Sequence, residues 1–175
     1  PQMLYMFAAM AVFSGYPKET RLDYVKKFYQ HTSKFNISLP TPIMAGLRTK
    51  SRQFASCTVI KCDDSIKSIN ASTSAIVEYV SQRAGIGLDI GAIRAEGSEI
   101  RGGEAYHTGL IPFIKLEQAA VGSASQGGVR KGSATITFPL WHKDVESLLV
   151  LKNNRGVEEN RARHLDYAVA INGYL

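Results

Sequence analysis

Residues 54–90 decide the fold, and they read FASCTVIKCDDSIKSINASTSAIVEYVSQRAGIGLDI. The β-branched residues of Phe54–Lys61 predict a strand. Asp63-Asp64-Ser65 then offers a helix cap, because an Asp or Ser side chain can accept a hydrogen bond from an amide of the first turn. Apolar residues recur at helical spacing over 66–80, and a glycine separates that helix from a short strand, Ile86–Ile90. This order of strand, helix and strand predicts an α/β fold with parallel pairing.

The rest of the chain contains further helices and strands. Met3–Phe13 is apolar on nearly all sides, as a buried helix would be, and Lys18–His31 forms a second predicted helix after Pro17. Downstream, the patterns predict a helix, a strand, a helix and a strand over Thr108–Val121, Ala134–Leu140, Lys143–Lys152 and His164–Ile171. We therefore expect a helical lead-in over residues 1–36 and an α/β region over residues 37–175.

Composition is that of a soluble globular protein. The 175 residues are 45% hydrophobic and 21% charged, and a chain of this length can bury a sizeable core. No apolar run reaches the ~20 residues that cross a bilayer. The apolar run Met3–Phe13 also lacks the basic start and cleavage site of a signal peptide. We expect a cytoplasmic protein with no membrane partner.

The net charge of +6 comes from 21 Lys and Arg against 15 Asp and Glu. The basic residues are scattered, and no dense run or recognisable nucleic-acid module is present. We therefore expect no nucleic acid polymer as partner. Isolated arginines beside glycine turns suit the phosphates of a small nucleotide better.

A glycine-rich stretch, SQGGVRKGSA over residues 125–134, combines backbone freedom with polar side chains. Arg130 and Lys131 can pair with phosphate, and Gln126 can read a base edge. The alternative is a flexible surface turn between a helix and a strand.

Cysteine and histidine spacing predicts neither a disulfide nor a metal site. Cys57 and Cys62 are five residues apart on a predicted strand and its exit, so their side chains point to opposite faces. A lone cysteine on a strand is usually a small buried apolar residue. The four histidines are too scattered to indicate zinc.

Further short motifs accompany the glycine-rich stretch. They are SLPTPIMAG, RQFASC, SQRAGIG, RGGE, WH and LLVLKNNRGVE, at residues 38–46, 52–57, 81–87, 101–104, 141–142 and 148–158. In their order and spacing, over nearly the whole chain, these motifs together resemble one known family, the large catalytic chain of class I ribonucleotide reductase. The resemblance implies the first half of a ten-stranded α/β barrel after a helical N-terminal segment. It also implies the radical reduction of ribonucleoside diphosphates to deoxyribonucleotides for DNA synthesis.

The resemblance assigns a redox role to Cys57, one of two cysteines that become a disulfide, its partner lying outside this chain. Substrate contacts fall on Thr41, Ser56, Ala84, Gly85, Gln126 and Arg130. A plain turn or core role stays open for each of these, and most of all for Ala84, whose side chain has no polar group.

An allosteric effector site is also implied, which would bind a deoxynucleoside triphosphate or ATP. Its residues would be Asp64, Ser65, Ile66, Arg94 and Ile100. Asp64 would meet the sugar, Arg94 the phosphates and Ile100 the base, although an ordinary helix cap remains an alternative for Asp64. The glycine-rich stretch would couple this site to the substrate pocket. Lys131 and Ala124 depart from the family pattern, as do Glu99, Lys143 and Asp144, which we expect to be exposed and of little weight.

The family also implies partners. The radical would come from a metal cofactor in the small subunit, thioredoxin or glutaredoxin would be the external reductant, and the chain itself would bind no metal or other cofactor. Homodimers would form through the helix at residues 64–83. Because the chain begins without Met and lacks the radical-forming cysteine, we expect a piece of the large subunit that is inactive alone. A non-catalytic nucleotide-binding or assembly module is the alternative.

Overall fold

The computed structural model describes residues 2–50, 52–126 and 130–173. The chain divides into two compact units, Pro1–Ser56 and Cys57–Leu175. The division that the sequence suggested after residue 36 stays a prediction.

The first unit consists of the helices α1 (Gln2–Val12), α2 (Lys18–Ser33) and α3 (Thr41–Gly46). The packing in this unit buries only Ala8 and Ala9 of α1. Met3 is 88% exposed and Phe7 is 52% exposed. The expectation that this helix is buried on nearly all sides is therefore wrong for this unit, in which the small residues Ala8 and Ala9 are buried and larger ones such as Met3 and Phe7 are exposed.

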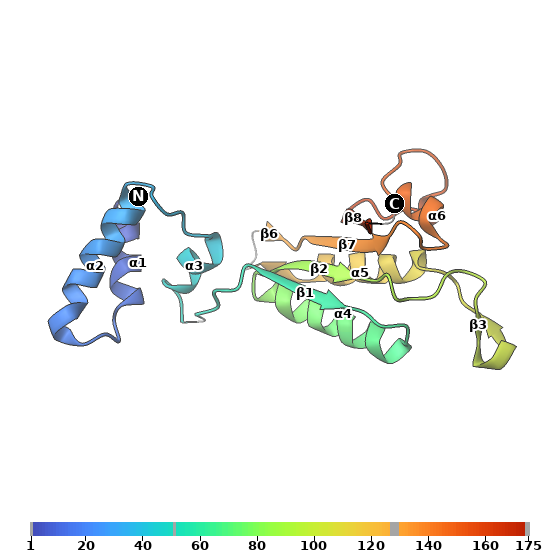
Figure 1. The fold of residues 1–175 in the computed structure, drawn as a ribbon, viewed down its shortest axis with the longest axis horizontal. Coiled ribbons are helices and arrows are strands. Elements are labelled where there is room, and N and C mark those ends of the chain that lie inside the picture. The colour runs from blue at the N-terminus through green and yellow to red at the C-terminus, as the bar shows by residue number, and fades with distance from the viewer. Residues whose placement is uncertain (1, 51, 127–129, 174–175) are drawn as a thin grey trace. The chain divides into compact units, whose positions relative to one another are not determined.

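The second unit is built on a four-stranded parallel sheet of order β1-β2-β7-β8 (Figure 1). The strands are β1 (Cys57–Lys61), β2 (Gly85–Asp89), β7 (Ala134–Pro139) and β8 (Asp166–Ala170). In the register, Cys57 pairs with Gly85, and all three strand pairs are parallel. The expected α/β class with parallel pairing is confirmed.

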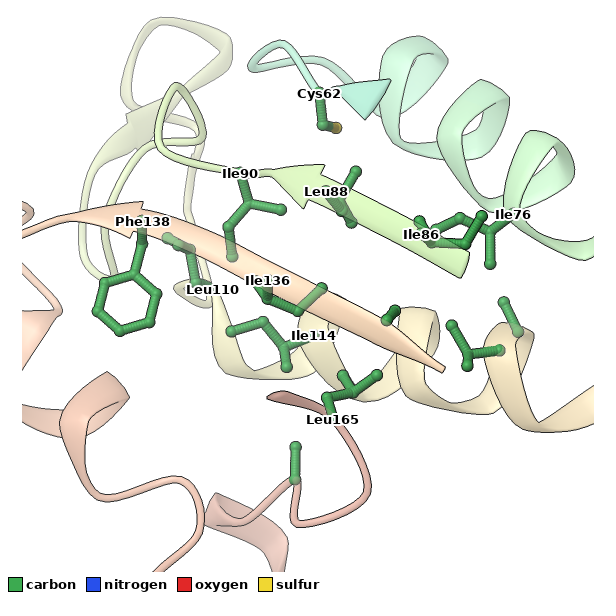
Figure 2. Packing of buried hydrophobic residues seen from close by; sticks show 14 of the residues in the cluster. Cys62, Ile76, Ile86, Leu88, Ile90, Leu110, Ile114, Ile136, Phe138 and Leu165 are labelled. Carbon is green, nitrogen blue, oxygen red and sulfur yellow. The ribbon is translucent and has the colours of Figure 1, made fainter. Parts of the chain in front are cut away.

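Two long helices, α4 (Ile66–Ser81) and α5 (Ile111–Ser123), cover one face of this sheet (Figure 1). Alternate residues of β2 and β7 point into that layer and are buried, among them Leu88 and Ile136 (Figure 2). They pack with Ile76 of α4 and Ile114 of α5 in one hydrophobic cluster. The opposite face of the sheet is open, since Val59 of β1 is 85% exposed.

The remaining elements are short. They are a hairpin of β3 (Glu99–Ile100) and β4 (Ala105–Tyr106) around the 3-10 turn η1 (Arg101–Gly103), a hairpin of β5 (Ser125–Gln126) and β6 (Arg130–Lys131), α6 (Val145–Leu149), and the 3-10 turn η2 (Glu158–Asn160). Figure 1 shows β3 and β6 at opposite ends of the second unit.

The structure moves several predicted boundaries, including those of β2 and β8, and three of the changes are larger. Strand β1 begins at Cys57 rather than Phe54, because its partner strand β2 begins at Gly85, which pairs with Cys57. Helix α5 begins at Ile111 rather than Thr108, because Gly109 has a φ of 81°, which no right-handed helix contains. Helix α6 spans only Val145–Leu149 of the predicted Lys143–Lys152.

Candidate functional site

The predicted site residues of the second unit lie in two groups, one at each edge of the parallel sheet. Asp64, Ser65 and Ile66 follow the carboxyl end of β1, and Arg94 follows the carboxyl end of β2. Cys57 and Gly85 are the first residues of the same two strands. We call Asp64, Ser65, Ile66 and Arg94 the carboxyl-edge group, and Cys57 and Gly85 the amino-edge group.

The carboxyl-edge group begins with a capped helix. The Ser65 hydroxyl accepts a hydrogen bond from the Ser68 amide at 3.1 Å, so Ser65 is the N-cap of α4. The Ser68 hydroxyl in turn accepts from the Asp63 amide at 2.9 Å. Ser65 therefore serves as the cap, and the Asp64 carboxylate is available for another contact.

Asp64 binds Arg94 through two hydrogen bonds. The Arg94 Nε donates to Asp64 Oδ2 at 2.6 Å, and the Arg94 backbone amide donates to Asp64 Oδ1 at 3.1 Å. Both side chains are about one-third exposed, at 38% for Arg94 and 31% for Asp64. At that exposure the ion pair is worth about 0–1 kcal/mol, so its main effect is to fix the direction of the guanidinium.

The same guanidinium reaches the β3–β4 hairpin. Arg94 Nη1 donates to the Glu99 carbonyl at 2.8 Å, which brings the half-buried Ile100 next to the ion pair. An arginine has five N–H donors, and these contacts use two of them. Within the described ranges, no other group accepts from Arg94. The carboxyl-edge group thus combines an oriented cation, a helix start and exposed Ile66, which together suit a phosphate-bearing ligand.

The amino-edge group lies on the open face of the sheet. Cys57 is exposed and stands opposite Gly85 in the register, while the Thr58 hydroxyl donates to the Gly85 carbonyl at 3.4 Å. Cys57, Gly85 and Asp166 line a cavity of about 350 Å³. Ala84 is only 1% exposed, so its side chain belongs to the core.

The two cysteines differ in environment. Cys62 is buried in the hydrophobic cluster, and both cysteines are thiols rather than one disulfide. The prediction that they are not partners is confirmed. In the ranges that the structure describes, no group of three or more His, Cys, Asp or Glu side chains could hold a metal ion.

The β5–β6 hairpin joins the amino-edge group through the backbone. The Ile86 amide of β2 donates to the Ser133 carbonyl at 3.1 Å. Residues 127–129 and the side chains of Gln126 and Arg130 lie outside the described part of the structure, so their predicted roles stay predictions. Gly132, which follows β6, lies against Val80 near the carboxyl end of α4.

The hairpin and the Asp64–Arg94 pair are therefore at opposite ends of α4. This helix has 16 residues, which separates its ends by about 24 Å at about 1.5 Å a residue. Within one chain, the described residues of the glycine-rich stretch, such as Gly132, do not lie at the predicted effector site.

Two predicted substrate residues belong to the first unit. Thr41 is the first residue of helix α3 rather than part of a turn, and Pro40 precedes it in extended conformation. Ser56 is the last residue before β1.

Sequence reasoning missed three polar residues of the second unit, of which His142 and Glu117 are buried and Asp144 is half-buried. Asp144, expected to be exposed, is half-buried and accepts hydrogen bonds from the Glu96 and Leu110 amides. His142 is 9% exposed and bonds the Ile93 carbonyl. Glu117 is 2% exposed, and burial raises the pKa of its carboxyl despite a hydrogen bond with Thr73 that lowers it. No sequence pattern marks their partners, which lie 34 to 49 residues away.

None of the helices in the described part of the chain combines the length and apolarity needed to cross a membrane.

Two family models match the chain and together cover almost all of it. Residues 1–52 match the ribonucleotide reductase all-alpha domain, and residues 55–175 match the ribonucleotide reductase barrel domain. The chain therefore belongs to the ribonucleotide reductase family, and its four-stranded parallel sheet with flanking helices is part of a barrel. The resemblance that the motifs indicated is confirmed.

Curated relatives agree with this assignment. The chain is 68% identical over 171 residues to the ribonucleoside-diphosphate reductase subunit alpha of Haemophilus influenzae. It is 67% identical over 171 residues to the ribonucleoside-diphosphate reductase 1 subunit alpha of Escherichia coli, and 58% identical over 175 residues to the ribonucleoside-diphosphate reductase subunit alpha of Enterobacteria phage T4. These matches cover 98%, 98% and 100% of this chain but only 23%, 22% and 23% of the relatives. The chain thus spans less than a quarter of the large subunits that it resembles.

Proposed function

We propose that the chain is the part of a ribonucleoside-diphosphate reductase large subunit that holds the allosteric effector site, one redox cysteine and part of the substrate site. The observation that carries this proposal is the Asp64–Arg94 pair beside the Ser65-capped start of α4, in a chain of the reductase family. The bound effector would be a deoxynucleoside triphosphate or ATP. Its phosphates would meet the remaining N–H donors of Arg94, its sugar Asp64, and its base Ile100.

The amino-edge group supplies the redox and substrate part of the proposal. Cys57 is exposed at the mouth of the cavity that it shares with Gly85, so its thiol is accessible to a substrate on the open face of the sheet. Reduction of the ribose needs two electrons, and the oxidation of two thiols to a disulfide supplies them. The second thiol would come from the part of the large subunit beyond this chain.

Turnover would need further proteins. The small subunit would supply the radical from its metal cofactor, and thioredoxin or glutaredoxin would reduce the disulfide after each cycle. This chain's share would be to bind the effector, to present Cys57 and to form one wall of the substrate pocket. We therefore expect no reductase activity from the chain alone.

A symmetric dimer would explain how the two edges communicate. Helix α4 carries exposed apolar residues near both of its ends, namely Ile66 at the start and Val77 and Tyr79 near the end. Two copies related by a two-fold axis perpendicular to α4 would pair this helix in antiparallel fashion. The glycine-rich hairpin at the carboxyl end of one α4 would then lie beside the Asp64–Arg94 pair of its partner, which removes the separation of about 24 Å. We propose residues 64–83 as this interface, and a chain that stays monomeric with and without nucleotide would contradict it.

The effector site is tested by isothermal titration of the chain with the four deoxynucleoside triphosphates and ATP. We expect Asp64→Ala and Arg94→Ala to weaken binding at least tenfold, since each removes a charged contact. Lys152→Ala is the matched control, because Lys152 forms a comparable exposed ion pair with Asp166 at the amino edge. Equal losses in all three variants, or binding by none of the nucleotides to the folded chain, would refute the proposed site.

A further inference from the structure

His142 and Asp144, in the loop that follows β7, form hydrogen bonds with the backbone on both sides of Arg94. His142 Nε2 lies 2.8 Å from the Ile93 carbonyl. The Asp144 carboxylate accepts from the Glu96 amide, at 3.1 Å to Oδ1 and 3.2 Å to Oδ2. The segment that carries Arg94 is therefore fixed one residue before the arginine and two residues after it.

Each of the two residues is itself held in place. His142 Nδ1 accepts from the Asp144 amide at 3.1 Å, which leaves Nε2 to face the Ile93 carbonyl. Asp144 Oδ2 also accepts from the Leu110 amide at 3.2 Å, immediately before helix α5. The carboxylate thus anchors the Arg94 segment to the start of a rigid helix.

The burial pattern explains why this arrangement directs Arg94. Ile93 is 2% exposed and Ala95 is 6% exposed, so both neighbours of the arginine point into the core. Arg94 points the other way, toward Asp64. Loss of the contacts at Ile93 and Glu96 would free this short segment to rotate, and the guanidinium would lose its direction.

We propose that His142 and Asp144 are positioning residues of the nucleotide site, which orient Arg94 for the ligand without touching it. This inference rests on the proposed effector function, and it assigns specific residues to the preorganisation of that site. A bond network that only stabilised the fold would alter the unfolding free energy and leave nucleotide affinity unchanged.

Two measurements test the inference. The first is nucleotide affinity: we expect Asp144→Ala to raise the dissociation constant for the four deoxynucleoside triphosphates about tenfold. Asp144→Asn, which keeps one acceptor oxygen, should raise it less. In an Arg94→Ala background, Asp144→Ala should have no further effect, because the two residues act through one contact. Asp23→Ala, which removes an exposed carboxylate of α2 in the first unit, should leave affinity unchanged.

The second measurement needs no ligand. Hydrogen exchange of the Arg94 Nε–H, followed by NMR, reports the bond to Asp64 directly. We expect faster exchange in Asp144→Ala and partial recovery in Asp144→Asn. His142→Gln, which keeps a donor for the Ile93 carbonyl, should also retain slow exchange. If Asp144→Ala does not fold, the positioning role is tested by comparing the Arg94 Nε–H exchange rates of Asp144→Asn and His142→Gln with that of His142→Leu, in which we expect faster exchange.

The outcomes separate this inference from the function on which it rests. If the folded wild-type chain binds none of the nucleotides but Arg94 Nε–H exchange responds as expected, the effector proposal fails and the positioning role stands. If nucleotides bind and neither their affinity nor the exchange rate changes in the Asp144 and His142 variants, the positioning role is overturned. An effect of Asp144→Ala on affinity that persists in the Arg94→Ala background would also overturn it.

Discussion

Replacement of Glu117 by glutamine should stabilise the second unit at neutral and alkaline pH. Glu117 of α5 is 2% exposed, and its Oε1 lies 2.8 Å from the Thr73 hydroxyl of α4. Its Oε2 has no hydrogen-bond partner among the described residues. The Thr73 hydroxyl has one hydrogen, and the Ile69 carbonyl, 3.0 Å away, competes for it.

The magnitude follows from the cost of burying an ionised group without partners. An unsatisfied buried polar atom costs about 1–3 kcal/mol, and a charged one costs more. Glutamine keeps the shape and removes the charge, but it leaves one buried amide group without a partner. We therefore expect a net gain in the free energy of unfolding of about 1 kcal/mol at pH 8.

The gain should depend on pH in a defined direction. Burial raises the pKa of Glu117 above its ordinary value of 4.5. Below about 4.5 the carboxyl is protonated in both the folded and the unfolded chain, and burial then incurs no charge penalty. As the pH rises through the folded pKa, the unfolded chain ionises more readily, and stability falls.

Urea unfolding followed by circular dichroism at pH 4, 6 and 8 measures this difference. Glu78→Gln is the control, since Glu78 is an exposed carboxylate on the neighbouring helix α4. The reasoning is refuted if Glu117→Gln destabilises the protein at pH 8, or if its effect is the same at pH 4 and pH 8.

Three further predictions concern the core, a buried tyrosine and the redox site. Gly132→Ala should lower the free energy of unfolding by about 1–3 kcal/mol, because the added Cβ would lie 2.6 Å from both the Val121 carbonyl and Val80 Cγ1. Gly122→Ala is the control: open space surrounds this position, so the substitution should be neutral or stabilising in thermal unfolding. Burial, with a smaller effect of Asp166, raises the pKa of Tyr167 from 10 to about 12. The protonated Tyr167 hydroxyl therefore stabilises the fold below pH 10, and this stability should be lost as the pH rises from 10 toward 12, where the unfolded chain ionises first. In Tyr167→Phe, a spectrophotometric titration should lack one ionisation near pH 12, and stability at pH 7 should fall by about 1 kcal/mol through loss of the 2.6 Å bond to the Ala162 carbonyl. Cys57→Ser in the complete large subunit should abolish thioredoxin-dependent turnover and leave nucleotide affinity intact, and unchanged turnover would count against the redox role.

Much of the fold could be predicted because local patterns determine it. The alternation of β2 and β7, the helical spacing of α4 and the Ser65 cap all depend on neighbours within a few residues. The two-residue strands of the β3–β4 hairpin were missed, since so short an element has no periodicity. The burial of α1 was overestimated because an apolar sequence does not reveal which side chains a partner helix covers.

The candidate site likewise has residues that the sequence could identify and supporting contacts that it could not. The motifs identified Asp64 and Arg94 through a family resemblance, but their hydrogen bond joins residues 30 positions apart, and only the fold brings them together. Asp144 was dismissed as exposed because its partners, Glu96 and Leu110, are 48 and 34 positions away. Polar residues that hold distant loops have no local signature, and this is why the site's supporting contacts required the structure.

The most direct test of the central claim is an NMR titration of the ¹⁵N-labelled chain with a deoxynucleoside triphosphate. We expect the largest shift changes on the amides of residues 64–66 and 94–100 and on the Arg94 side chain. Changes confined to the amino edge, around Cys57 and Gly85, or no changes with nucleotide in large excess over the folded chain, would contradict the proposed effector site.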